Sequence, residues 1–173
     1  VFFITHRNQW PKIQGTYVVQ NAGYHHYIGK LNGHVGLSLL NDNAGSGTLK
    51  TVDLSFLYAQ NIKIKNVAIK AGLKAGYRQR SLDISKLTFG DQIDSQLGFI
   101  NSESTYIGVS TVSYFNFSFG VSAFHKGFCL GAAVANAFEP NESFISTEGT
   151  LPMRVSLQLS KNISSFSVIT SIF

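Results

Sequence analysis

The chain has 173 residues, a length that fits one domain. Hydrophobic residues make up 44% of it, yet no stretch stays apolar for the roughly 18 residues that a transmembrane helix needs, so such a helix is excluded. Charged residues make up 13%, about half of the roughly 25% typical of soluble domains, and the net charge is +5. The single cysteine, Cys129, excludes an intrachain disulfide and is predicted to be a small packed residue.

The first third of the chain predicts short strands separated by polar turns. Three strand candidates occupy residues 1–6, 16–28 and 34–40. The pair Asn32-Gly33 predicts a two-residue hairpin turn between the second and the third. The sequence NDNAGSGT at 41–48 predicts a polar loop.

The run from Thr51 to Arg80 predicts two long strands joined near Lys65-Asn66. Apolar and polar residues alternate along both, which is the pattern of extended strands with two unlike faces. Each strand exceeds the usual roughly 5–6 residues and is near the roughly 9–11 needed to cross a bilayer. The polar face predicts a basic barrel lumen made of Lys63, Lys65, Lys70, Lys74, Arg78 and Arg80.

The remaining segments continue the pattern, with two interruptions. Residues 81–105 lose the alternation and predict a long structured excursion, either an outer loop or a segment folded into the lumen. Alternation resumes at Tyr106, and turns are predicted at Lys126-Gly127 and Lys161-Asn162. Three further strands are expected after the first of these turns, at residues 128–135, 154–160 and 164–173. A second excursion, at residues 139–152, separates the first of these strands from the second.

Together these elements predict an all-β, antiparallel transmembrane β-barrel of the outer-membrane type, with residues 1–173 as one domain. The chain starts and ends abruptly within the pattern, which we interpret as a fragment of a larger barrel lacking its N- and C-terminal regions. A soluble β-sandwich is the competing fold, and it would need the Phe115–Phe119 face buried under a second sheet. Because the basic residues share one strand parity, a lumen or rim patch is favoured over a nucleic-acid surface, and no nucleic-acid partner is predicted.

No catalytic residue, metal ligand or cofactor is predicted. Asp91 and Asp94 are spaced for acid–base chemistry, but a turn at Gly90 with both side chains capping backbone N–H groups is the favoured interpretation. His25 and His26 are adjacent in a strand and point to opposite faces, so they are unsuited to grip one ion. The His6–Trp10 segment is left open: it could be a buried polar plug or a partner-docking strand, or Trp10 could anchor at the membrane interface while Arg7 pairs with an acid inside the barrel.

Four segments, in this order, carry a resemblance: HRNQWP (6–11), HYIGKLNGHVGLSLLNDNAGSGTL (26–49), KLTFGDQID (86–94) and PNESF with LPM (140–153). They resemble the PorP/SprF family of outer-membrane proteins of the type IX secretion and gliding-motility systems of Bacteroidota, over nearly the whole chain. Members of that family usually begin with an Asn-Pro-Ala-rich segment and continue for further strands. Both features are missing here, which agrees with the fragment interpretation.

The resemblance implies a non-enzymatic barrel in the bacterial outer membrane. It would dock or anchor a secreted cell-surface adhesin through the adhesin's C-terminal targeting domain, and would contact other secretion or motility components. A passive outer-membrane pore with a basic lumen is the alternative. Candidate docking or structural positions from the matching segments are Arg7, Asn8, Gln9, Trp10, Asp42, Gly45, Phe89, Gly90, Asp91, Gln92, Asp94, Pro140, Asn141, Glu142 and Pro152.

Overall fold

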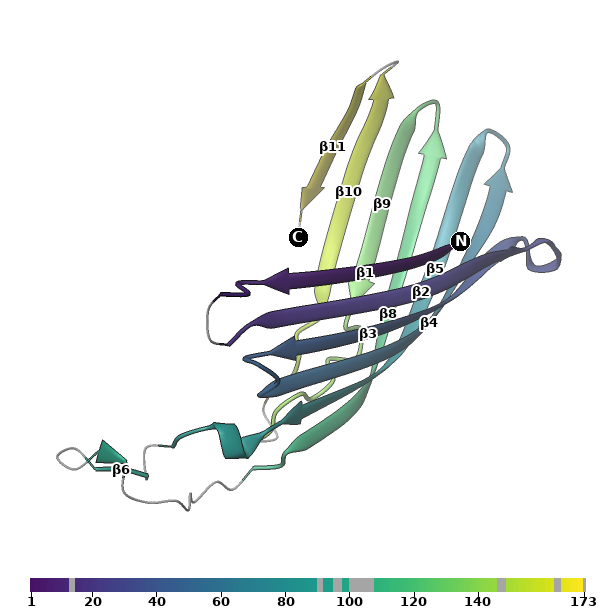
Figure 1. The fold of residues 1–173 in the computed structure, drawn as a ribbon. Coiled ribbons are helices and arrows are strands. Elements are labelled where there is room, and N and C mark those ends of the chain that lie inside the picture. Colours follow the sequence, from purple (N-terminus) through teal and green to yellow (C-terminus); the bar gives the residue numbers. More distant parts are fainter. Residues whose placement is uncertain are drawn as a thin grey trace.

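The computed structural model describes residues 1–12, 15–89, 92–94, 98–99, 108–145, 149–163 and 166–172. They form one curved antiparallel sheet of nine strands in the order β1-β2-β3-β4-β5-β8-β9-β10-β11 (Figure 1). The strands are β1 (Phe2–Gln9), β2 (Tyr17–Ile28), β3 (Gly33–Ala44), β4 (Leu49–Ile64), β5 (Val67–Leu82), β8 (Thr111–His125), β9 (Phe128–Ala135), β10 (Arg154–Ile163) and β11 (Phe166–Ile172).

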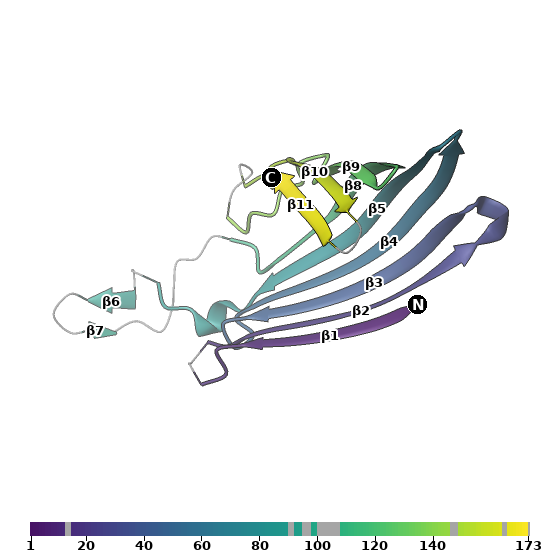
Figure 2. The same ribbon diagram turned by 90° about the horizontal axis from the view of Figure 1, so that it is seen from above.

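Three smaller elements lie in the connections. The 3-10 helix η1 (Gly29–Leu31) joins β2 to β3, and η2 (Ile84–Lys86) follows β5. A small hairpin of β6 (Ile93–Asp94) and β7 (Gly98–Phe99) forms a separate two-stranded sheet that projects away from the main one (Figures 1 and 2). No helix among the described residues is both long and apolar enough to span a membrane.

The strand connections divide the sheet into two ends. At the end that we call the tight-turn end, short connections join β2 to β3, β4 to β5, β8 to β9 and β10 to β11 (Figure 1). At the opposite end, the long-loop end, lie the connections of residues 10–16, 45–48, 83–110 and 136–153. The predicted turns at Lys65-Asn66 and Lys126-Gly127 are confirmed, because Ile64 pairs with Val67 and His125 pairs with Phe128.

Two other predicted turns were misplaced, and the predicted loop at 41–48 is confined to residues 45–48. Asn32 has a φ of 44° and ends a longer connection, while Gly33 already pairs with Ile28 as the first residue of β3. Lys161 and Asn162 lie inside β10, paired with β11. Residues 41–44 belong to β3: Asp42 lies on the polar face, and Asn41, on the apolar-face parity, donates from Nδ2 to Gln20 Oε1 on the neighbouring strand at 3.3 Å.

The two faces of the sheet differ as the alternation predicted. The apolar face carries large exposed side chains on every strand whose side chains are described from β1 to β10, for example Leu54 at 53%, Phe115 at 64% and Leu157 at 52% exposure. The polar face carries the most buried side chains of the sheet, Asp53, Ser55, Tyr114 and Asn116. Tyr114 is the single buried hydrophobic residue in the described part of the chain, so the sheet has no apolar core of its own.

The all-β antiparallel fold is therefore confirmed, but the sheet is not closed. In the described residues β1 pairs with β2 alone and β11 with β10 alone, so both edges of the sheet are unpaired (Figure 2). The alternative of a soluble β-sandwich is wrong for the described residues, since Phe115 and Phe119 are 64% and 48% exposed and no second sheet covers them.

Candidate functional site on the polar face

An acidic residue on β4 holds together the polar face near the long-loop end. Asp53 is 4% exposed and pairs across the strands with Arg78 on β5. Both Nε and Nη2 of Arg78 lie 2.9 Å from Oδ2 of Asp53, and Lys74 Nζ lies 3.9 Å from Oδ1. The Ser55 hydroxyl donates to Oδ1. Both oxygens of the enclosed carboxylate therefore have cationic or hydroxyl partners in place of the water that it loses on burial.

An ion pair and a hydrogen bond of Glu142 attach the second excursion to the polar face of the sheet. Glu142 Oε2 accepts a hydrogen bond of 3.0 Å from the Tyr114 hydroxyl and lies 2.9 Å from Nη1 of Arg80. The guanidinium of Arg80 also lies 5.6 Å from the centre of the Phe144 ring. Residues 142–144 thus lie against the polar face of β5 and β8.

Asparagine side chains fix the same loop at its start. Asn116 Nδ2 on β8 donates to Asn136 Oδ1 at 2.8 Å, and Asn136 Nδ2 donates to the carbonyl of Pro152 at 3.1 Å. Within the loop, the amide of Leu151 donates to the carbonyl of Pro140 at 2.8 Å, so the two ends of the loop are held together. The predicted positions Pro140, Glu142 and Pro152 therefore all take part in the hydrogen bonds that hold this loop together and to the sheet.

The Arg7–Trp10 segment lies at the long-loop end of edge strand β1. Arg7 and Gln9 are on the polar-face parity and Asn8 on the apolar-face parity, as their pairing with β2 shows. Trp10 has a φ of 54°, is 59% exposed and meets the Tyr17 ring edge-on at 5.5 Å. Arg7 is exposed, and within the described residues no ion pair joins it to an acid.

The other predicted positions also lie at the long-loop end. Asp42 is on the polar face of β3 with a buried Oδ1 that accepts no hydrogen bond from the described residues. Gly45 has a φ of 62° and begins the β3–β4 turn, where Thr48 Oγ1 donates to its carbonyl at 2.7 Å. Phe89 and Gln92 contact each other, with the Phe89 amide donating to Gln92 Oε1 at 2.8 Å.

The rest of the acidic motif at 89–94 is not described. Gly90 and Asp91 lie outside the described residues, and Asp94 is described only through its backbone in β6. The turn at Gly90 with Asp91 and Asp94 as caps of backbone N–H groups therefore stays a prediction. The part of the chain that the structure describes holds no group of three or more metal-ligating side chains.

The family model for "Type IX secretion system membrane protein PorP/SprF" matches residues 2–173. The chain belongs to the PorP/SprF family. Membership identifies it as a membrane component of the type IX secretion system and places it outside the enzyme families. Neither the comparison with curated proteins nor the comparison with solved structures gives a match.

The six predicted basic lumen residues of this PorP/SprF protein fall into three groups. Five of them lie on the polar-face parity, while Lys65 occupies the β4–β5 turn with a φ of 51°. Arg78 and Arg80 are in ion pairs, and Lys74 makes the longer contact to Asp53. Lys63 and Lys70 are exposed, and the Lys70 ammonium lies 5.4 Å from the Phe124 ring centre.

Small residues line an open groove of about 460 Å³ on the polar face, between Lys70 and Lys74 on one side and β10 on the other. The pairing of β4, β5, β8, β9 and β10 places its floor in one cross-strand row: Ala59, Gly72, Gly120, Ala133 and Ser156. Because none of these side chains extends far from the backbone, the wall is smooth here and its basic side chains border open space.

The sequence interpretation missed Asp53, Ser55 and Tyr114 as a connected group. The sequence did contain a signal for the pairing of Asp53 with Arg78. A two-residue turn at Lys65-Asn66 dictates that Asp53 lies opposite Arg78, since the strands pair outward from the turn without a bulge. The contact from Glu142 had no such signal, because it depends on the path of a long loop.

Proposed function

We propose that this PorP/SprF protein is an outer-membrane component whose sheet forms the wall of a β-barrel. At its long-loop end it would dock a secreted cell-surface adhesin through the adhesin's C-terminal domain. The supporting observation is that Glu142 and Asn136 bind the described parts of the second excursion, residues 136–145 and 149–152, to the polar face by hydrogen bonds and an ion pair. A preformed surface loses little conformational entropy when a partner binds.

The apolar face supports the membrane part of the proposal. Side chains such as Phe2, Leu39, Phe115 and Leu159 are 64%, 49%, 64% and 53% exposed, and they continue from strand to strand. An exposed apolar surface of this extent marks contact with lipid or protein. In hydrocarbon an unpaired sheet edge is unfavourable, because its N–H and C=O groups have no water to bind. Embedding in a bilayer therefore requires that the free edges of β1 and β11 become paired.

The docking part is tested by co-purification from native membranes. The tagged protein, extracted in detergent, should carry secreted surface proteins with it, and Trp10→Ala should reduce their yield several-fold. Trp10 is a large aromatic side chain at the long-loop end with 59% exposure, and aromatic residues of this kind often dominate binding energy. The matched control is Leu31→Ala, which removes a 48% exposed apolar side chain at the tight-turn end and should leave the yield unchanged.

Equal losses in both variants, or no secreted chain in any sample, would refute docking at the long-loop end. A set of secretion components that persists after Trp10→Ala would show that the variant is folded and assembled. The experiment thereby separates adhesin docking from membership of the secretion system.

A passive pore is the second candidate, and the smooth groove beside Lys70 and Lys74 favours it. Conductance across a planar bilayer distinguishes the two. A docking barrel filled by its loop should be silent, whereas a stable open channel with anion preference, reversed by Lys70→Glu together with Lys74→Glu, would favour the pore.

A further inference from the structure

The tight-turn end of the sheet has an unusual charge composition. The chain segments that build it are residues 24–35, 60–71, 122–131 and 158–169. They contain six lysines and not one aspartate or glutamate; all nine acidic residues of the chain lie elsewhere. The lysines are Lys30, Lys63, Lys65, Lys70, Lys126 and Lys161.

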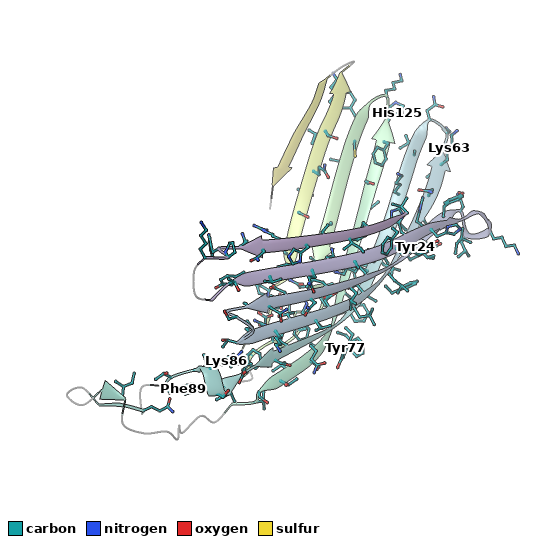
Figure 3. The ribbon with its side chains drawn as sticks, in the orientation of Figure 1. Tyr24, Lys63, Tyr77, Lys86, Phe89 and His125 are labelled. Carbon is teal, nitrogen blue, oxygen red and sulfur yellow. The ribbon has the colours of Figure 1, made fainter. Side chains whose placement is uncertain are left out.

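Four of these lysines stand at the rim itself. Lys30 lies in η1, Lys65 and Lys126 lie in the β4–β5 and β8–β9 turns, and Lys161 lies near the end of β10, with all four exposed. Figure 3 shows this edge, with Lys63 and His125 next to two of the turns. The four lysines come from four different hairpins, so positive charge is distributed along the rim rather than gathered in one patch.

Lys161 shows how this rim relates to the apolar face. It pairs across the strands with Phe128 and lies on the apolar-face parity, and its ammonium is 4.7 Å from the centre of the Phe128 ring. Phe128 is 47% exposed and Leu130, two residues further from the turn, is 60% exposed. An ammonium over the ring of an exposed aromatic residue, beside a turn and on the apolar face, is the arrangement expected of a lysine at a membrane boundary.

We propose that the tight-turn rim binds the headgroups of anionic phospholipids, with Lys30, Lys65, Lys126 and Lys161 as the contacting residues. This inference rests on the proposed insertion of the apolar face in a bilayer. If that face is embedded, the rim lies at the level of the headgroups, because the turns follow the last apolar residues directly. With no acidic side chain in these segments to neutralise them, the lysines favour lipids with a net negative charge.

The long-loop end has cations too, but it has acids among them. Lys86 lies 3.7 Å from Asp83, and Arg80 is paired with Glu142. The lysines of the tight-turn rim have no such partners in the described residues. An acidic soluble protein is the competing occupant of the rim, but Lys161 over Phe128 lies on the lipid-facing side, which a soluble partner would not reach.

The test measures which lipid the reconstituted full chain prefers. The protein is placed in phosphatidylcholine vesicles, and the association of spin-labelled phosphatidylglycerol is compared with that of spin-labelled phosphatidylcholine. We expect phosphatidylglycerol to be favoured about fivefold at low salt, with the preference falling as salt is added. The rim variant combines Lys30→Gln, Lys65→Asn, Lys126→Asn and Lys161→Gln and should abolish the preference. Asparagine is used at the two turn positions because Lys65 and Lys126 have φ values of 51° and 45°, which asparagine adopts readily.

The matched control removes four positive charges from the other end: Lys12→Gln, Lys50→Gln, Lys86→Gln and Arg154→Gln. It should keep the preference. Loss of the preference in both variants would show a net-charge effect and overturn the assignment to the rim, as would a preference that survives in the rim variant.

Two further outcomes distinguish a failure of lipid binding at the rim from a failure of the proposed membrane insertion. If the wild-type chain does not insert into any vesicle, the membrane part of the proposed function fails and the inference fails with it. If the chain inserts without lipid preference, and the rim variant instead loses an acidic protein in co-purification, the rim is a protein surface. The single variant Lys161→Gln, which leaves the turns unchanged, should lower the preference by itself.

Discussion

The polar face of β4, β5 and β8 contains two regions that the sequence pattern does not distinguish. Toward the long-loop end, Asp53, Arg78 and Tyr114 are enclosed and linked by hydrogen bonds and ion pairs. Toward the tight-turn end, Lys70 is exposed beside a groove floored by Gly72 and Gly120. In both regions polar and small residues alternate with apolar ones. The alternation therefore decides which face a residue lies on, whereas the cross-strand neighbour and the overlying loop decide whether its charge is paired.

The largest expected effect tests the enclosed region. Asp53→Ala leaves Arg78 and Lys74 without their anion and Ser55 without its acceptor, and should lower the free energy of unfolding by about 3 kcal/mol. Lys70→Ala, in the open region, should change it by less than about 0.5 kcal/mol. Guanidinium titration of both variants in the same detergent measures the difference. Similar values for the two would mean that the enclosed network contributes no more than an exposed charge.

Glycines give a second test with the same substitution in both regions. A Cβ at Gly76 would lie 2.9 Å from the Ser55 hydroxyl and 3.6 Å from the Asp53 carboxylate, so Gly76→Ala should cost about 1–2 kcal/mol. A Cβ at Gly120 would meet nothing nearer than 3.6 Å, and Gly120→Ala should be neutral or slightly stabilising because alanine loses less backbone entropy on folding. The unfolding midpoints of the two variants measure this difference in stability. A destabilised Gly120→Ala would show that the open groove is more tightly packed than its contacts indicate.

These residues also show how far sequence reasoning reaches. Strand faces were predictable because the period of two places Leu54 and Phe56 on one side and Asp53 and Ser55 on the other. Register was predictable for β4–β5, since a two-residue turn pairs Asp53 with Arg78. The turn at Asn32-Gly33 was misplaced because a four-residue connection can also end in a left-handed asparagine.

Contacts made by long loops were beyond prediction. Nothing in the sequence near Glu142 indicates that its carboxylate meets Arg80 and Tyr114, because the loop's path is determined by several weak contacts at once. Whether the sheet closes into a barrel could not be predicted from the sequence pattern either. Alternation reports what each face of a strand contacts, but it carries no information on what pairs with the edges of β1 and β11.

A third prediction concerns the loop that covers the enclosed region. Glu142→Gln replaces the carboxylate that accepts from Arg80 and Tyr114, and should speed hydrogen exchange of the 136–145 amides about fivefold to tenfold without changing global unfolding. Glu139→Gln is the matched control. The Glu139 carboxylate accepts from the backbone amide of Met153 at 3.1 Å, a bond that an amide oxygen can replace. If both variants exchange alike, the loop is held by its asparagines and not by the ion pair.

The smallest effect is expected where a carboxylate lies beyond the strands in solvent. The hydroxyl of Ser85 donates to Asp83 Oδ1 at 2.6 Å, and with Lys86 nearby it holds the pKa of Asp83 below its ordinary value. A lowered folded-state pKa contributes stability above the unfolded pKa, and this contribution is lost as pH falls through the folded pKa. Ser85→Ala should therefore raise the titration midpoint of the Asp83 carboxyl carbon, measured by NMR in micelles, and leave stability at neutral pH unchanged within error. If Ser85→Ala lowered the stability at neutral pH as much as Asp53→Ala does, the contributions of Asp83 and Asp53 to stability would not depend on their exposure. The contrast drawn between enclosed and open charge on this sheet would then need another cause.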